Sequence, residues 1–297
     1  MLKMLGVFIS VLASVGILFG GILIWGMGKY GPYEYTVPPV PGEQTVELEV
    51  SEGHARLRLE ARGSGEPAVL LLHGFNGSLN NWDRVWPGLV DCGQHIRVDL
   101  PGFGESVGPW RDYTVPAQSE RMIALLDELA VGRAIVVGTS MGGSIAAWMS
   151  AAYPDRVVGA VLMAPSGMRG GLKMSSVAEM FFHRGGLNSI AAALARSPIY
   201  KKLYPDSRVL QALTVTASYG ERWEAMVSKI RQPVTILWSE SDATVPFENM
   251  EKLGKAISGA RTIAASPEAG HNIPGNDPDL VVQEICGLYE QTRESVR

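Results

Sequence analysis

The residues best suited to chemistry lie in the stretch Gly-Thr-Ser-Met-Gly-Gly at positions 138–143. An apolar, β-branched run (134–137) precedes it and a helix-forming run (144–149) follows, so the pattern predicts a strand, a tight turn and a helix. A serine on such a turn has strained backbone, and flanking glycines leave room for the turn and for an approaching substrate. Free N–H groups at the start of the helix favour developing negative charge. The pattern indicates that Ser140 is a nucleophile, and the alternative is a flexible glycine-rich loop.

A serine hydroxyl needs a base to take its proton, and that base is usually a histidine held in one tautomer by a carboxylate. His271 lies in a glycine-flanked loop after the last predicted strand, and Asp242 lies in the loop after the preceding strand. We therefore expect Ser140, Asp242 and His271 to form a catalytic triad. Asp99 is a competing carboxylate, although its Gly/Pro-rich surroundings suit a residue that fixes its own turn.

Two backbone N–H groups are expected to complete the site. The tripeptide His-Gly-Phe at 73–75 follows a buried strand, and Met141 follows the candidate nucleophile directly. The N–H groups of Phe75 and Met141 are therefore the predicted oxyanion-hole donors. His73 itself is expected to shape the turn rather than to carry protons.

Alternating strands and helices are expected to position these residues. Apolar runs that predict strands alternate with helical runs of about ten to fifteen residues, which indicates an α/β fold with a mainly parallel central sheet flanked by helices. Loops at the carboxyl ends of such strands form the ligand-binding edge. The predicted strands are Thr45–Val50, His54–Ala61, Pro67–Leu72, His95–Asp99, 134–137, Val157–Met163, Val234–Trp238 and Arg261–Ala265, and the predicted helices are Asn80–Val90, Ala117–Leu129, 144–149, Glu248–Ile257 and Pro278–Arg293.

The stretch from 166 to 229 interrupts this alternation. It is rich in Met, Leu, Phe and Tyr at helical spacing, and it shows no strand pattern. We interpret it as a helical cap inserted into an α/β core made of 45–165 and 230–297. The alternative is a set of ordinary core helices. An apolar, methionine-rich cap suits an adaptable hydrophobic pocket.

The N-terminus differs in composition from the rest. Residues 4–28 include no charged side chain, and the run is long enough to cross roughly 30 Å of hydrocarbon. We predict a transmembrane anchor at 1–29 and a proline-rich linker at 30–44; the alternative is a cleaved secretory signal. Two positive charges, Lys3 and the terminal amine, precede the apolar run, and one, Lys29, follows it. Because positive charge favours the cytoplasmic side, this small excess weakly favours a catalytic domain on the non-cytoplasmic (periplasmic) side of the membrane.

Composition excludes several other functions. The chain has 297 residues and a net charge of −4, so it offers no basic surface for nucleic acid. Its two cysteines, Cys92 and Cys286, are too few and too far apart for a zinc site, and we expect neither metal nor organic cofactor. They are interpreted as structural thiols; a disulfide between them is the alternative, in an oxidising compartment.

Taken together, the motifs resemble the α/β-hydrolase superfamily from about Thr45 to the C-terminus. They are His-Gly-Phe at 73–75, Asp-Leu-Pro-Gly-Phe-Gly-Glu-Ser at 99–106, Gly-Thr-Ser-Met-Gly-Gly at 138–143, Asp242 before Val-Pro, and Gly-His at 270–271. The apolar N-terminus and the serine motif are similar to those of membrane-anchored monoacylglycerol lipases. The first two motifs also resemble those of small bacterial lipases and esterases.

The resemblance implies an enzyme that cleaves apolar or lipid-like carboxylic esters through an acyl-enzyme. Ser140 differs from the aspartate nucleophile of haloalkane dehalogenases and epoxide hydrolases. Carbon–carbon bond hydrolases of ring-cleavage pathways share much of the pattern, but they commonly place tryptophan after the catalytic histidine, where this chain has Asn272. That activity and a non-catalytic binding module are the two alternatives.

Overall fold

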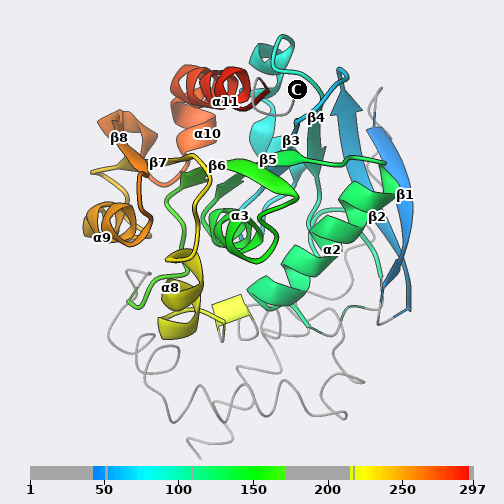
Figure 1. Cartoon of the computed structure of the whole chain (residues 1–297), viewed down its shortest axis with the longest axis horizontal. Coiled ribbons are helices and arrows are strands. Elements are labelled where there is room, and N and C mark those ends of the chain that lie inside the picture. Colours follow the sequence, from blue (N-terminus) through cyan, green and yellow to red (C-terminus); the bar gives the residue numbers. More distant parts are fainter. Residues whose placement is uncertain are drawn as a thin grey trace, which may run out of the picture.

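The central element is an eight-stranded sheet in the order β1-β2-β4-β3-β5-β6-β7-β8 (Figure 1). The computed structural model describes residues 43–50, 53–108, 110, 112–170, 215, 216 and 218–293. The first two strands pair antiparallel with each other and with β4, and every other neighbouring pair is parallel. The predicted, mainly parallel sheet is therefore confirmed. The strands are β1 (Glu43–Val50), β2 (Gly53–Arg62), β3 (Ala68–Leu72), β4 (His95–Val98), β5 (Ala134–Thr139), β6 (Val157–Met163), β7 (Val234–Ser239) and β8 (Arg261–Ala265).

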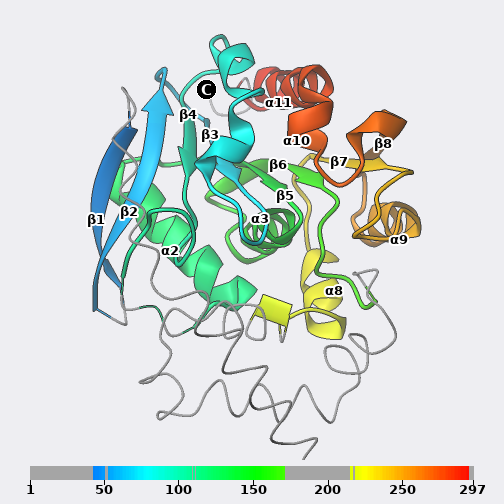
Figure 2. The same ribbon diagram turned by 180° about the vertical axis from the view of Figure 1, so that it is seen from behind.

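Burial explains which strands could be recognised from apolar runs. Every residue of β3, β5 and β7 is buried, because helices cover both faces of the sheet there. The helix α11 and two short 3₁₀ helices lie over one face, and α2, α3 and α9 lie over the other (Figures 1 and 2). The helices are α2 (Val115–Glu128), α3 (Met141–Ala152), α8 (Glu221–Val227), α9 (Glu248–Ala256), α10 (Ile273–Asn276) and α11 (Pro278–Arg293).

The helix predicted over Asn80–Val90 is wrong. The segment forms two 3₁₀ helices, η1 (Leu79–Trp82) and η2 (Trp86–Leu89). Pro87 has no N–H to donate in the middle of the predicted helix, and its ring disfavours continued α-helical backbone. The apolar positions that suggested one helical face, Trp82, Trp86 and Leu89, are nevertheless all buried.

The interpretation of the cysteines as two free thiols is also wrong. Cys92 and Cys286 form a disulfide with their Cα atoms 5.2 Å apart. It joins the turn before β4 to α11, across a sequence separation of 194 residues. The pairing depends on how α11 returns over the sheet, which spacing in the sequence does not reveal.

Parts of the predicted domain organisation fall outside the described residues. The anchor at 1–29, most of the linker at 30–44 and most of the cap at 166–229 lie there. Of the cap, the structure describes its first residues, up to Gly170, and its last, which include α8. Among the helices of the described residues, none combines the length and the apolar character needed to cross a bilayer.

A buried histidine in β4 makes stability depend on pH. His95 is buried, with Nδ1 3.0 Å from the carbonyl oxygen of Gly93, and it meets Trp86 edge-on. Burial lowers the pKa of His95; the nearby charge of Arg62 acts in the same direction, and the Gly93 carbonyl and Glu60 oppose it. The unfolded chain therefore binds a proton at this residue more readily than the folded chain does.

We expect the free energy of unfolding to fall as pH decreases below about 6.5, where an unfolded histidine begins to charge. In His95→Asn, whose amide can still donate to the Gly93 carbonyl, the fall should be smaller. Urea unfolding between pH 5 and 8 measures both curves. Equal slopes for the wild type and the variant would show that His95 does not contribute.

Candidate active site

Ser140 occupies the turn between β5 and α3, as predicted. Its φ of 54° and ψ of −115° form a strained conformation for a residue with a side chain, at a cost of about 1–3 kcal/mol. The neighbouring glycines permit the turn. A Cβ at Gly138 would lie 2.2 Å from the carbonyl oxygen of Gly142, and a Cβ at Gly142 would lie 2.2 Å from that of Leu72. The turn thus presses the start of α3 against the end of β3.

This packing gives a testable difference between two helical glycines. Gly142→Ala is expected to destabilise the protein by several kcal/mol, on the order of the largest single-residue effects, because the clash is with backbone that cannot move aside. Gly287→Ala in α11 is the matched control. Its Cβ meets no atom within 4 Å, and alanine is favoured over glycine in helices by about 1 kcal/mol. Thermal unfolding of both variants checks this, and equal midpoints would contradict the tight contact at Gly142.

His271 and Asp242 are hydrogen-bonded, with 2.8 Å between Nδ1 and Oδ2. The Asp242 carboxylate is fully buried, whereas the His271 side chain is 27% exposed. A carboxylate only accepts hydrogen bonds, so Nδ1 carries the proton and Nε2 keeps its lone pair. The imidazole is thus held in the tautomer that can act as a base.

The environment of Asp242 keeps its carboxylate charged. Burial opposes ionisation, but hydrogen bonds from His271 and from the backbone N–H groups of Val245 and Thr244 outweigh it, and the His271 ring attracts the carboxylate further once that ring is protonated. The two N–H groups lie 2.9 and 2.7 Å from Oδ1. The pKa of Asp242 therefore lies below its ordinary value. The charged form is available to stabilise an imidazolium.

Hydrogen bonds from two serine hydroxyls link the Asp242 loop to the segment that precedes His271. Ser239 donates through Oγ to the carbonyl of Ser266 at 2.9 Å, and Ser241 donates to the carbonyl of Pro267. Both loops follow the carboxyl ends of adjacent parallel strands, β7 and β8. Their separation is thus fixed by sheet pairing and by side-chain bonds across the gap.

The His-Gly-Phe loop at 73–75 lies against Ser140. A Cβ added to Gly74 would lie 3.3 Å from Cβ of Ser140 and 3.9 Å from its Oγ, so only glycine allows this approach without displacement. His73 shapes the loop: Nδ1 donates to the Gly74 carbonyl at 2.7 Å, and Nε2 accepts from the N–H of Leu100 at 3.0 Å. Both ring nitrogens are occupied, in agreement with the expected structural role.

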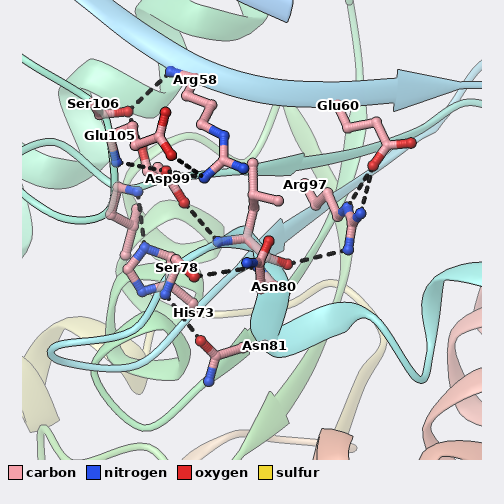
Figure 3. A network of polar contacts seen from close by, with 12 residues as sticks. Arg58, Glu60, His73, Ser78, Asn80, Asn81, Arg97, Asp99, Glu105 and Ser106 are labelled. Carbon is pink, nitrogen blue, oxygen red and sulfur yellow. Dashed lines mark hydrogen bonds and ion pairs between the residues drawn. The ribbon is translucent and has the colours of Figure 1, made fainter. Parts of the chain in front are cut away.

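Asp99 binds groups around its own turn (Figure 3), and the carboxylate that binds His271 is that of Asp242. Its carboxylate accepts from the N–H groups of Leu79 at 2.6 Å and Glu105 at 2.8 Å, and Arg58 lies 3.3 Å away. Figure 3 shows this network beside His73, so it also supports the loop that faces Ser140. Asp99 therefore joins the start of η1 and Arg58 of β2 to its own turn.

The predicted site residues thus follow the carboxyl ends of parallel strands. Phe75 comes after β3, Ser140 and Met141 after β5, Asp242 after β7 and His271 after β8. Within the described ranges, no three His, Cys, Asp or Glu side chains are grouped so that they could hold a metal ion.

Sequence reasoning missed a group of hydroxyls behind Ser140. Ser144, Ser166 and Tyr219 lie within hydrogen-bond distance of one another or of the Ser140 carbonyl. The one available signal was the spacing of Ser144, since a serine four residues after another in a helix can donate back to its carbonyl.

Comparisons with known proteins agree with this fold. A family model described as alpha/beta hydrolase fold matches residues 67–186. A dihydrolipoyllysine-residue acetyltransferase component of the acetoin cleaving system from Pseudomonas putida is 28% identical over 250 residues, which are 78% of this chain and 66% of that protein. An esterase of Mycobacterium tuberculosis is 27% identical over 256 residues, 77% of this chain and 84% of the esterase.

A solved esterase structure from Thermogutta terrifontis aligns with a TM-score of 0.66 and 26% identity, covering 84% of this chain and 99% of that one. This chain matches somewhat less than two thirds of the length of the first curated relatives. The fold and these matches support a hydrolase of the α/β-hydrolase superfamily.

Proposed function

We propose that this protein is a serine hydrolase that cleaves carboxylic esters of apolar or lipid-like substrates, of the monoacylglycerol lipase or carboxylesterase type. The observation that carries the proposal is the 2.8 Å hydrogen bond between His271 and Asp242, in loops at the same sheet edge as the strained Ser140. A buried carboxylate that orients a partly exposed imidazole suits general base catalysis.

In the proposed mechanism, Oγ of Ser140 attacks the ester carbonyl carbon while Nε2 of His271 accepts the hydroxyl proton. The negative charge on the former carbonyl oxygen is stabilised by the N–H groups of Phe75 and Met141. Asp242 stabilises the imidazolium, which then gives its proton to the departing alcohol. Water, deprotonated by His271, attacks the acyl-enzyme in the second step and releases the acid.

Two features favour an apolar substrate. Phe75, which follows the Gly74 that lies against Ser140, is 40% exposed, and its ring meets that of Phe103 edge-on with 5.4 Å between centroids. An apolar ring exposed at this position can contact an alkyl chain. The predicted cap, rich in methionine, would add adaptable apolar surface.

The test is hydrolysis of p-nitrophenyl esters of increasing acyl length by the full chain. We expect turnover, with higher kcat/KM for longer chains than for acetate. Turnover of a ring-cleavage dienoate, with none of any ester, would replace the proposal with the carbon–carbon hydrolase. Turnover of neither would favour the non-catalytic binding module.

We propose further that residues 1–29 anchor the protein and place the catalytic domain outside the cytoplasm. The uncharged run at 4–28 and the disulfide between Cys92 and Cys286 support this, because disulfides persist in oxidising compartments. Alkylation of intact cells with a maleimide polymer is expected to shift the protein's mobility only after reduction. No shift in reduced intact cells, with a shift once the reduced cells are lysed, would contradict this location.

A further inference from the structure

The carbonyl oxygen of Ser140 accepts hydrogen bonds from several donors. It accepts from the N–H of Ser144 at 3.0 Å, from Oγ of Ser144 at 3.2 Å and from the N–H of Ser166 at 3.3 Å. This carbonyl belongs to the peptide group that joins Ser140 to Met141. The N–H of the same peptide group is the oxyanion donor of the proposed function.

A layer of hydroxyls lies behind this carbonyl. Oγ of Ser166 donates to the Tyr219 hydroxyl at 2.7 Å and lies 3.4 Å from Oγ of Ser144. Burial raises the pKa of Tyr219 to about 12, against the lowering effect of the bonds to Ser166 and Ser144. Tyr219 therefore keeps its proton at physiological pH and acts as a neutral hydrogen-bonding group. Ser144, Ser166 and Tyr219 are named here the hydroxyl cluster.

The hydroxyl cluster joins three separate parts of the chain. Ser144 lies in the first turn of α3, Ser166 lies just after β6, and Tyr219 lies just before α8. The last two are the described ends of the predicted cap, and a further bond from the N–H of Gly220 to the carbonyl of Gly167 (2.8 Å) ties them together.

The helix α8 packs on α3 and holds the segments around Ser166 and Tyr219 next to it. The indole of Trp223 is fully buried and donates to the carbonyl of Ser144 at 3.0 Å. A Cβ at Gly167 would lie 2.5 Å from the same indole ring, so the chain leaving β6 packs directly on it. Figure 1 shows α8 near α3, with which it is in contact. The cluster is therefore built into the core.

We propose that Ser144, Ser166 and Tyr219 are positioning residues that fix and polarise the Ser140–Met141 peptide group, so that its N–H is aimed at the developing oxyanion. The proposal rests on the proposed ester hydrolysis and deepens it. Hydrogen bonds accepted by a peptide carbonyl strengthen donation by the N–H of that peptide, because the bonds polarise one another. Bonds from three donors also limit rotation of the peptide plane.

Tyr219→Phe removes one hydroxyl and keeps the ring, so it is the primary test. With a p-nitrophenyl ester, we expect kcat to fall on the order of 5-fold, the size of a modest hydrogen bond, while KM stays unchanged. A trifluoromethyl ketone, which forms an oxyanion on Ser140, should bind more weakly by the same factor. Rates are divided by the concentration of active sites, measured by titration with a fluorophosphonate. A smaller amount of folded protein is then not mistaken for a lower kcat.

Tyr153→Phe is the matched control, since it makes the same chemical change at the other end of α3. It should leave kcat and ketone affinity unchanged. Ser166→Ala provides a second break in the cluster should Tyr219→Phe fold poorly, and it should reproduce the fall in kcat. The double variant Ser144→Ala/Tyr219→Phe should lose no more than the worse single variant, because both act on one peptide group.

Three outcomes overturn the proposal while leaving ester hydrolysis in place. These are an unchanged kcat in both Tyr219→Phe and Ser166→Ala, equal losses in Tyr153→Phe and Tyr219→Phe, or a fall in kcat with unchanged ketone affinity. A wild-type protein that neither turns over esters nor reacts with the fluorophosphonate overturns the proposed function and this inference together.

Discussion

Ser140→Ala is expected to reduce kcat for ester hydrolysis on the order of 10⁶-fold, the loss seen when the nucleophile of such a triad is removed. The reason is chemical, because alanine supplies no oxygen to form the acyl-enzyme. Binding of the ester should persist, since neither the apolar surface nor the N–H donors depend on the hydroxyl. Steady-state kinetics with purified full-length protein measure the loss.

Ser150→Ala is the matched control for this variant. Ser150 is a buried serine of α3, the helix that follows Ser140. Its Oγ donates to the carbonyl of Ala146 at 2.8 Å. Its removal should change stability slightly and kcat by less than about 2-fold, as expected for a residue away from the reacting atoms. Similar activities in Ser140→Ala and the wild type would mean that another group attacks the ester.

Removing the disulfide is expected to have the largest effect on stability. A cross-link spanning 194 residues of sequence restricts the unfolded chain by about 5 kcal/mol in the chain-entropy model. Cys92→Ala/Cys286→Ala should therefore unfold at a temperature lower by roughly 10–20 °C, given the size of the domain. Scanning calorimetry measures the midpoint.

Reduction provides the control for the cysteine variant. Dithiothreitol should lower the midpoint of the wild type toward that of the double variant and should leave the double variant unchanged. A wild type that melts at the same temperature with and without reductant would contradict a stabilising disulfide.

The sheet was predictable because its central strands are buried on both faces. The run in β3 has no polar residue to obscure the pattern, and it ends in a loop with Gly74. The elbow was predictable for a different reason. The backbone packs so closely around this turn that a side chain at Gly138 or Gly142 would clash with a carbonyl oxygen. Glycine is therefore required at both positions, and the sequence motif reveals the turn.

Features that depend on the three-dimensional path of the chain were not predictable. The break at Pro87 was visible in the sequence, but the buried residues Trp82, Trp86 and Leu89 before and after it imitated one helical face. The disulfide requires the return of α11 over the sheet, and the hydroxyl cluster requires Ser166 and Tyr219 to meet across the predicted cap. Neither contact has a local spacing that could indicate it.

The central claim is that Asp242 and His271, brought together at the sheet edge, make the hydroxyl of Ser140 reactive. The most direct measurement is the rate of fluorophosphonate labelling of the full chain, with the labelled peptide identified by mass spectrometry. We expect a single label on Ser140, and labelling slower by about 10³-fold or more in His271→Ala and in Asp242→Asn. A label on another residue, or an unchanged labelling rate in both variants, would contradict it.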